Sequence, residues 1–294
     1  MEHVPTADDV QGAREDLDDI EFVDAGGFKA VFKATVVNRT EAVKLVYIPP
    51  ESEEETSRDE IVARVKREVE VLRLCKTNKL VKLGSIAMEA VSIGGHDYLI
   101  YSEEFLPGES LKDHIRARYR PNLDELFTLG LCLAEALQDL EATGHIHRDI
   151  KPGNVLATGL AERPFVLLDL GIAFKLHGTD LTLRGGGPPG TLRYMAPELL
   201  TPDYKNALDI RSDLYSAGVT IFEYAAGEHP IIGRGEDIAT TLLAITQRPA
   251  KKLNSLRQDL PDVFCALVER CIKKLPALRY PRPKALLQEL EAMK

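Results

Sequence analysis

The chain has 294 residues, of which 44% are hydrophobic and 28% are charged, values typical of a globular protein with one large domain or two lobes. Its formal net charge of −9 argues against non-specific binding to nucleic acid or to an anionic membrane surface. The sequence contains no run of roughly 18 apolar residues, so we predict no membrane-spanning helix. The acidic N-terminus is unlike a signal peptide. We therefore expect a cytoplasmic chain without membrane contact, although it could be cut from a longer, membrane-tethered protein.

Four cysteines form no C-x-x-C pair and are scattered among apolar neighbours: Cys75, Cys132, Cys265 and Cys271. Disulfides and structural metal sites usually show regular cysteine spacing. The pattern therefore predicts buried, reduced thiols.

In the N-terminal third of the sequence, the β-branched and aromatic residues recur in a pattern that predicts a sheet. Residues 1–19 are acidic and lack a sustained apolar period, so we expect a tail there. From Ile20 to Ile48, β-branched and aromatic residues recur around Gly26-Gly27 and Asn38-Arg39-Thr40. Three antiparallel strands joined by tight turns would give this pattern.

A helix and two more strands are expected next. Ser57 and Glu60 form a capping box, which would open a helix with one face made of Ile61, Val65, Glu68 and Leu72. Leu80 to Ile86 and Tyr98 to Tyr101 have strand composition, with a Gly94-Gly95 turn near the second. These elements complete a small five-stranded lobe with one helix.

The pattern changes from strand to helix after Pro107-Gly108, which we take as a boundary. Asn122 and Glu125 form a capping box for a long apolar helix that ends near residue 143. Val166 to Leu168 is expected as a short buried strand. Further helices are expected near residues 212–226, 236–247, 262–274 and 282–293.

The segment from Gly144 to Leu156 reads G-H-I-H-R-D-I-K-P-G-N-V-L and brings Asp149, Lys151 and Asn154 together. A phosphoryl-transfer site needs a group that accepts the nucleophile's proton, a cation beside the moving phosphate and an oxygen ligand for magnesium. Asp149, Lys151 and Asn154 can fill these roles in that order. The alternative is a polar loop between two buried elements. The segment resembles the catalytic loop of the eukaryotic-type (Hanks-type) serine/threonine protein kinase family.

Two more motifs extend this resemblance. Lys44, within A-V-K on the third expected strand, and Glu68, in the middle of the expected helix, are similar to the strand-lysine and helix-glutamate pair of kinases. Asp169-Leu170-Gly171 stands where the family has D-F-G, whose carboxylate binds magnesium.

The C-terminal half also carries family motifs. Ala196-Pro197-Glu198 resembles the A-P-E motif, and Arg279 is the expected buried partner of its glutamate. Asp213, in S-D-L-Y-S-A-G, resembles the helix aspartate that holds the backbone of the catalytic loop. The resemblance covers about Ile20 to Met293 with the motifs in order.

The resemblance implies an α+β, bilobal protein-kinase fold that spans residues 20–294 after the acidic N-terminal tail. The small N-lobe would be 20–103, with a five-stranded antiparallel sheet plus one helix. The hinge would be 104–107, and the larger, mainly α-helical C-lobe 108–294.

The resemblance also implies ATP and Mg2+ as cofactors and a protein substrate with a Ser/Thr acceptor. Asp149 and Lys151 would be catalytic, and Asn154 and Asp169 would bind the metal. The residues implied to bind ATP are Lys44, Glu68, Gly26, Gly27, Val31, Ala42, Glu104, Leu106 and Leu156.

The glycine-rich loop departs from the family pattern G-x-G-x-x-G-x-V. Residues 24–31 read D-A-G-G-F-K-A-V and retain only the middle glycine, Gly26. Glycines permit close approach of the backbone to phosphate, whereas Asp24 adds negative charge that Lys29 only partly offsets. We therefore expect weak ATP binding.

A second departure is Glu103. If Glu104 to Leu106 bind adenine, Glu103 occupies the gatekeeper position at the back of the pocket, which is usually apolar or Thr. We expect such a buried carboxylate to pair with Lys44 or an ordered water. The alternative is a one-residue shift that leaves Ser102 at the gatekeeper position and Glu103 facing solvent.

The sequence thus predicts transfer of the ATP γ-phosphate to serine or threonine, and autophosphorylation. Lys151 within I-K-P-G-N, and Gly190-Thr191 before Tyr194-Met195, favour Ser/Thr over Tyr as the acceptor. One rival is a pseudokinase that acts as a non-catalytic scaffold, which the altered glycine loop favours and the intact polar residues oppose. The other rival is a small-molecule kinase, which should lack A-P-E.

Arg148 is typical of kinases whose activation loop is ordered by a phosphate that pairs with this arginine. Residues 183–189 contain no hydroxyl group, so Thr182, and then Thr179, are the expected autophosphorylation sites. The alternative is that Arg148 only hydrogen-bonds backbone and that the loop needs no phosphate.

Overall fold

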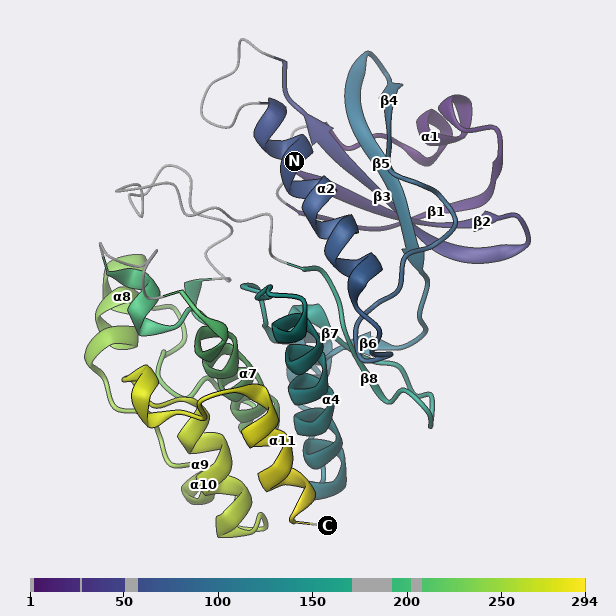
Figure 1. Cartoon of the computed structure of the whole chain (residues 1–294). Coiled ribbons are helices and arrows are strands. Elements are labelled where there is room, and N and C mark those ends of the chain that lie inside the picture. Colours follow the sequence, from purple (N-terminus) through teal and green to yellow (C-terminus); the bar gives the residue numbers. More distant parts are fainter. Residues whose placement is uncertain (1–2, 27, 51–57, 171–191, 202–207, 294) are drawn as a thin grey trace. The chain divides into compact units, whose positions relative to one another are not determined.

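The computed structural model describes residues 3–26, 28–50, 58–170, 192–201 and 208–293 (Figure 1). The chain forms two compact units. The N-terminal unit comprises Met1–Leu74 and Val81–Leu106, and the C-terminal unit comprises Cys75–Leu80 and Pro107–Lys294. The boundary between Leu106 and Pro107 falls within the expected hinge, 104–107. The sequence did not indicate that 75–80 belong to the C-terminal unit.

Hydrogen bonds explain why this short segment belongs there. The backbone N–H groups of Lys76 and Thr77 donate to one carboxylate oxygen of Asp139, at 2.6 and 2.8 Å. The N–H of Leu167 donates to the carbonyl of Lys79 at 2.8 Å. Because these partners all lie in the C-terminal unit, the segment folds with it.

A five-stranded antiparallel sheet in the N-terminal unit confirms the predicted sheet. Its strands, in the spatial order β1-β2-β3-β5-β4, are β1 (Leu17–Gly26), β2 (Lys29–Val36), β3 (Arg39–Ile48), β4 (Glu89–Ile93) and β5 (His96–Glu104). The β2–β3 turn has positive φ at Val37 and Asn38, and the β4–β5 turn has positive φ at Gly94 and Gly95. Such turns match the right-handed twist of the strands that they join.

The predicted strand at Leu80 to Ile86 is wrong, because the fourth strand is β4. The 80–86 segment follows β5 irregularly: the N–H of Gly84 donates to the carbonyl of Ser102 at 2.8 Å, but the N–H of Ser85 donates to the Glu41 carboxylate at 2.9 Å. A side chain that takes a backbone N–H in this way interrupts the ladder of a strand.

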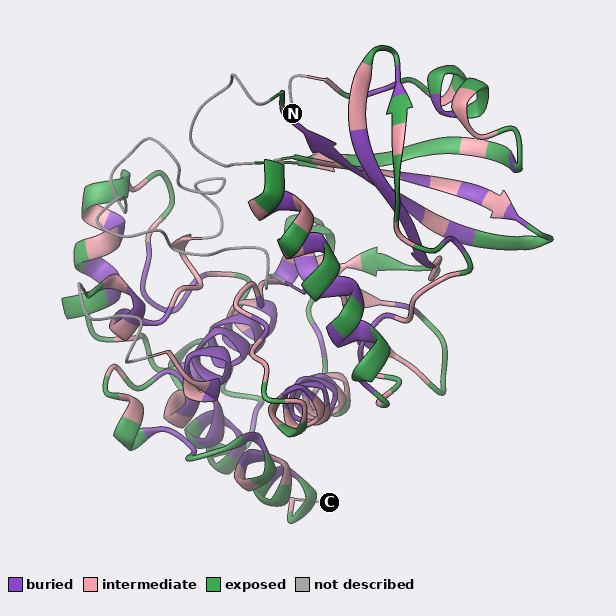
Figure 2. Cartoon of the chain, turned by 45° about the horizontal axis from the view of Figure 1, so that its top comes forward, coloured by how far each residue is buried: buried purple, intermediate pink, exposed green. Residues whose placement is uncertain are grey.

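Two helices cover opposite faces of the sheet, α1 (Ala7–Ala13) and α2 (Arg58–Leu74). Val10 of α1 packs with Phe32 and Leu45 on one face. Val65 of α2 packs with Val46 on the other face, and Figure 2 shows the buried stripe of α2. The predicted helix at α2 is confirmed, although its capping residue, Ser57, lies outside the described residues.

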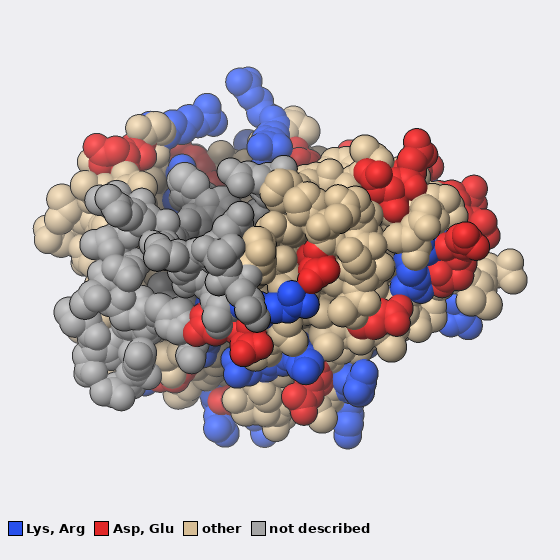
Figure 3. Space-filling view, turned by 90° about the horizontal axis from the view of Figure 1, so that it is seen from above, with Lys and Arg blue, Asp and Glu red and all other residues tan. Residues whose placement is uncertain are grey.

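The expected acidic tail is wrong for residues 6–19, which form α1 and the start of β1. Thr6 and Asp9 cap α1 reciprocally, and Val10 and Leu17 are completely buried. The acidic side chains near these two apolar anchors are exposed to solvent; they are Asp8, Asp9, Glu15 and Asp16. The view from above shows Asp and Glu gathered over the N-terminal unit (Figure 3).

The C-terminal unit is mainly helical, as predicted. Its described elements are β6 (Glu109–Ser110), α3 (Leu111–Arg116), α4 (Leu123–Ala142), η1 (Pro152–Asn154), β7 (Val155–Ala157), β8 (Phe165–Leu167), η3 (Pro197–Leu200), α7 (Ile210–Ala226), α8 (Ile238–Gln247), α9 (Leu253–Leu256), α10 (Asp262–Cys271), η4 (Pro276–Leu278) and α11 (Pro283–Glu291). The predicted capping box of Asn122 and Glu125 opens α4.

Helix α7 lies at the centre of this unit, between α4 and α10. A Cβ atom on Gly218 would lie 2.5 Å from Cys271 Cβ, so α7 approaches α10 too closely for a larger residue there. All four cysteines are buried and free, as predicted. Among the described helices, none is both long and apolar enough to cross a membrane.

Candidate active site

The predicted catalytic loop joins α4 to β7, and its three polar residues meet. The Lys151 ammonium donates to both carboxylate oxygens of Asp149, at 2.9 and 2.7 Å. The amide nitrogen of Asn154 donates to the backbone carbonyl and to the carboxylate of Asp149, both at 2.8 Å. Because these donors hold the Asp149 side chain from two sides, the carboxylate has a fixed orientation.

Burial raises the pKa of Asp149, and the nearby Asp169 adds to this effect, while Lys151 and Asn154 oppose it. A carboxylate with a raised pKa accepts a proton more readily than an ordinary aspartate does. The environment of Asp149 therefore suits a general base.

The backbone of the loop is held by Asp213 of α7, as the sequence predicted. Its two carboxylate oxygens accept the N–H groups of His147 and Arg148, at 2.6 and 2.8 Å. Arg148 has a φ of 71°, a left-handed conformation that costs a non-glycine residue about 1–3 kcal/mol. The two hydrogen bonds to Asp213 offset this strain and fix the backbone before Asp149.

His147 is fully buried and ties the loop to the end of β8. Its Nδ1 accepts the N–H of Asp149 at 3.3 Å, so its Nε2 carries the proton and donates to the carbonyl of Leu168 at 3.1 Å. Burial lowers the pKa of His147 to about 4, so the ring is neutral at pH 7. The sequence placed His147 in the motif but did not indicate this role.

Asp169 lies two residues after the end of β8 and has a φ of 50°. The N–H of Leu168 donates to the carbonyl of Asn154 at 2.7 Å, so the two residues implied as metal ligands are fixed to adjacent backbone. Asn154 is buried and Asp169 half-buried. A carboxylate and an amide oxygen are ligands that suit a hard divalent cation.

The predicted pair of Glu198 and Arg279 is present. The guanidinium of Arg279 makes two hydrogen bonds to the Glu198 carboxylate, at 2.6 and 2.7 Å, and its side chain is fully buried. It also donates to the backbone carbonyls of Arg211, Lys273 and Lys274. This pair links η3 to the helical core of the unit.

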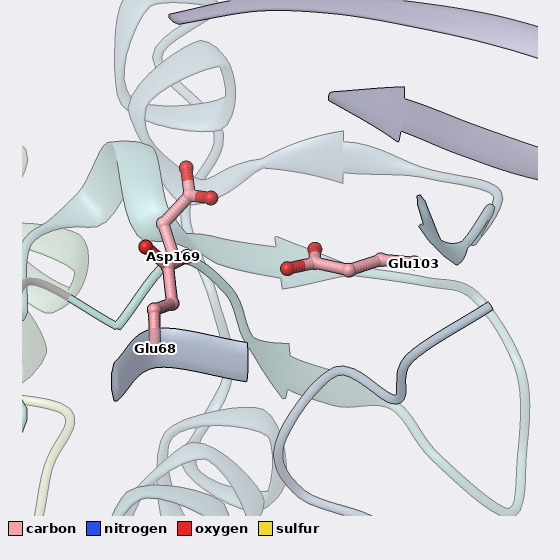
Figure 4. A group of neighbouring side chains, drawn as sticks. All are labelled: Glu68, Glu103 and Asp169. Carbon is pink, nitrogen blue, oxygen red and sulfur yellow. The ribbon is translucent and has the colours of Figure 1, made fainter. Parts of the chain in front are cut away.

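In the N-terminal unit, Lys44 of β3 is almost fully buried and forms an ion pair with Glu103 of β5. Its distance to Glu68 Oε1 is 3.9 Å. Figure 4 shows the Glu68 and Glu103 side chains, which come from α2 and β5. The predicted Lys44–Glu103 pair is therefore confirmed, and the alternative with Glu103 in solvent is wrong because Glu103 is only 2% exposed.

The strand register places Lys44 on the same face as other residues implied to bind ATP. Val31 pairs with Lys44, and Ala42 pairs with Glu103. Residues directly opposite each other in a sheet share a face, so these four side chains do too. Ser102 belongs to the other face, where its hydroxyl donates to Glu41 at 2.5 Å.

The remaining residues implied to bind ATP belong to both units. Glu104 and Leu106 are half-buried at the end of the N-terminal unit. The N–H of Glu104 donates to the carbonyl of Lys82 at 2.9 Å, so an adenine would have to use the carbonyl of Glu104. Leu156 lies on β7 in the C-terminal unit and is half-buried. Gly26 is exposed.

Several predicted features lie outside the described residues. They are Gly27 of the glycine-rich loop, Gly171 of the D-L-G motif, the Gly190-Thr191 segment, and the expected phosphorylation sites Thr179 and Thr182. The predictions for these residues stay predictions.

The buried carboxyl of Asp213 allows a pH-dependent stability to be predicted. Burial raises its pKa to about 6 from the ordinary 3.8, against the opposing effect of its two N–H donors. Between these pH values the folded state binds more protons than the unfolded state. The contribution of Asp213 to the unfolding free energy is therefore lost as pH rises. We expect this loss to reach about 2 kcal/mol of unfolding free energy between pH 4 and pH 7, measured by urea denaturation.

The matched variant is Asp213→Asn, which keeps the shape but cannot titrate. The difference in unfolding free energy between the wild type and this variant should change with pH, because only the wild type loses stability through this group as pH rises. Stability curves that run parallel over this range would show that Asp213 does not titrate with a raised pKa.

Comparison with known proteins agrees with this geometry. The family described as "Protein kinase domain" matches residues 18–290. A probable serine/threonine-protein kinase of Clostridium perfringens is 28% identical over 97% of this chain and 39% of its own length. The probable serine/threonine-protein kinase PknB of Bifidobacterium longum is 30% identical over 78% of this chain and 32% of its own length.

A third relative, the serine/threonine-protein kinase PknJ of Mycobacterium tuberculosis, is 37% identical over 50% of this chain and 24% of its own length. The aligned part therefore spans at most about two fifths of these three relatives. Because the family match covers nearly the whole chain, and because the catalytic loop, its supporting aspartate and the Glu198–Arg279 pair are all in place, the chain belongs to the protein kinase domain family.

Proposed function

We propose that the chain is a serine/threonine protein kinase that transfers the γ-phosphate of Mg-ATP to protein substrates and to itself. The observation that carries this proposal is the arrangement around Asp149. Its carboxylate accepts hydrogen bonds from Lys151 and Asn154, and Asp213 holds the backbone of the loop. We further propose that the chain acts in the cytoplasm, in keeping with its four free thiols.

Each residue has a defined task in this proposal. Asp149 accepts the proton of the substrate hydroxyl, and Lys151 places a positive charge beside the phosphate that moves. Asn154 binds the metal through its side-chain oxygen, because its nitrogen donates to Asp149. Asp169 supplies a carboxylate to the same cation, and Lys44 contacts the α- and β-phosphates. When bound, ATP supplies the phosphoryl group and the cation neutralises its charge.

The names of the relatives and the I-K-P-G-N sequence around Lys151 favour serine and threonine as acceptors. Peptide libraries that differ only in the acceptor residue test this part of the proposal. We expect labelled phosphate from ATP on peptides with Ser or Thr. Equal or faster labelling of Tyr peptides would contradict the Ser/Thr assignment.

The alternative of a non-catalytic scaffold has less support. It rests on the altered glycine-rich loop, whereas the hydrogen bonds of Lys151 and Asn154 to Asp149 support a catalytic role. The loop affects the binding of phosphate more directly than the chemical step.

The geometry of the loop sharpens the expectation of weak ATP binding. The Asp24 carboxylate accepts the N–H of Ala25 at 2.8 Å, so it occupies a donor that could otherwise bind phosphate. Replacing Asp24 and Lys29 by glycine should lower the KM for ATP several-fold while changing kcat less, because the loop mainly binds phosphate. Steady-state kinetics at varied ATP measure both. An unchanged or higher KM would show that these side chains are used in binding.

A further inference from the structure

We propose that Glu103 of β5, rather than Glu68 of α2, is the residue that positions Lys44 for the nucleotide. The inference rests on the proposed function in one respect, the contact of Lys44 with the nucleotide phosphates. It goes beyond that function because it assigns the positioning of the lysine to the sheet and not to the helix.

Two carboxylates lie near the Lys44 ammonium, at different distances. Lys44 Nζ forms its direct ion pair with Glu103 Oε1, whereas Glu68 Oε1 lies 3.9 Å away, beyond hydrogen-bonding distance. The same oxygen of Glu68 accepts the Tyr101 hydroxyl at 3.2 Å. Glu103 is therefore the nearer carboxylate to Lys44, while Glu68 also accepts a hydrogen bond from Tyr101.

The register of the sheet explains this difference. Lys44 lies directly opposite Tyr101, and Glu103 lies two residues further along β5, on the same face. Side chains at such diagonal positions are within reach of long residues. Glu103 thus reaches Lys44 from the neighbouring strand, whatever the position of α2.

Burial makes the shorter contact dominant. Lys44, Glu68 and Glu103 are 3, 6 and 2% exposed, so water and salt screen their interactions weakly. Coulomb energy rises as distance falls, and a hydrogen bond between charged groups adds to it. For these reasons the direct pair with Glu103 should set the position of the ammonium.

The consequence is an unusual tolerance at Glu68. The Glu68→Gln variant should lose no more than about threefold in kcat/KM for ATP, since Lys44 keeps its direct partner. The Glu103→Gln variant should lose roughly 10- to 100-fold, the range expected for one hydrogen bond between charged groups. The KM for the peptide substrate should stay unchanged in both.

A matched control is Glu41→Gln. Glu41 is a buried carboxylate of the same sheet, 4% exposed, but it lies on the opposite face and binds Ser85 and Ser102. Replacing this carboxylate by an amide should lower the thermal stability without changing kcat/KM for ATP in the folded fraction. A comparable loss of activity in this control would mean that Glu103→Gln acts through general damage to the sheet, which would overturn the proposal.

A double-mutant cycle decides which carboxylate pairs with Lys44 and requires no turnover. Urea midpoints are measured for Lys44→Met combined with Glu103→Gln, and for Lys44→Met combined with Glu68→Gln. We expect strongly non-additive shifts for the first combination and nearly additive shifts for the second. Stronger coupling to Glu68 would overturn the proposal.

The two experiments separate failure of this inference from failure of the proposed function. A wild-type chain that transfers no phosphate would count against the kinase activity, while the cycle would still decide the partner of Lys44. An active wild type with equal losses in the Glu68→Gln and Glu103→Gln variants would overturn only the inference. A Glu103→Gln variant that is faster than the wild type would also overturn it, because Glu103 would then hold Lys44 away from the nucleotide.

Discussion

Replacing Asp149 by asparagine should lower kcat for phosphate transfer by roughly 10^2- to 10^4-fold, the usual contribution of a general base. The substitution keeps the volume of the side chain and removes its ability to accept the proton. Initial rates of label transfer from ATP to a Ser/Thr peptide measure the effect. The KM for ATP should change much less, because the base acts only in the chemical step.

The fold of the Asp149→Asn variant should remain intact, since the loop backbone is held by Asp213 and His147. Thermal unfolding checks this point. A suitable control is Asp139→Asn: its carboxylate binds the backbone of Lys76 and Thr77 and takes no part in the catalytic loop. That variant should keep its kcat. If Asp149→Asn and the wild type transfer phosphate at equal rates, Asp149 is not the base.

The second large effect should be on stability. Changing Glu198 to glutamine should lower the unfolding free energy by about 3 kcal/mol or more, because it leaves the buried charge of Arg279 without its carboxylate. The two hydrogen bonds of 2.6 and 2.7 Å from Arg279 would lose the negative charge of their acceptor, and one of them would lose its acceptor oxygen. Urea denaturation at neutral pH measures the change.

An exposed pair in the same unit provides the control. Glu228 lies 2.9 Å from Lys251, and both side chains are nearly half exposed. Glu228→Gln should therefore change the unfolding free energy by less than about 1 kcal/mol. Equal effects of the two substitutions would mean that burial does not strengthen the Glu198–Arg279 pair.

Strong local patterns made most of the fold predictable. The alternating residues of β1 to β3, the paired glycines before β5 and the capping box of α4 each specify structure over a few neighbouring residues. Helix α1 was missed because a single completely buried residue, Val10, anchors it to the sheet. Such a helix has almost no apolar period, and only its Thr6–Asp9 cap could have signalled it.

The segment 80–86 was misjudged for a different reason. Its apolar residues suit a strand, and Leu80 and Val81 are indeed buried. Its ladder is interrupted where Ser85 bonds to Glu41, a residue 44 positions away. Contacts of this kind depend on the tertiary fold, which residue patterns along the chain do not encode.

The candidate site shows the same contrast. The pairing of Asp149 with Lys151 and Asn154 followed from their spacing within one loop. The pairing of Lys44 with Glu103 followed from the cost of burying a lone carboxylate. By contrast, no sequence pattern indicated that Tyr101 would bind Glu68, because that contact depends on how α2 packs against β5.

The wild-type chain itself should transfer phosphate from ATP. The most direct measurement is mass spectrometry of the chain and of a generic Ser/Thr acceptor protein after incubation with ATP and Mg2+, beside a reaction with the metal chelated. We expect phosphate on serine or threonine of the acceptor, and none after chelation. An acceptor and a chain that both stay unmodified, although the chain binds ATP, would contradict the kinase activity.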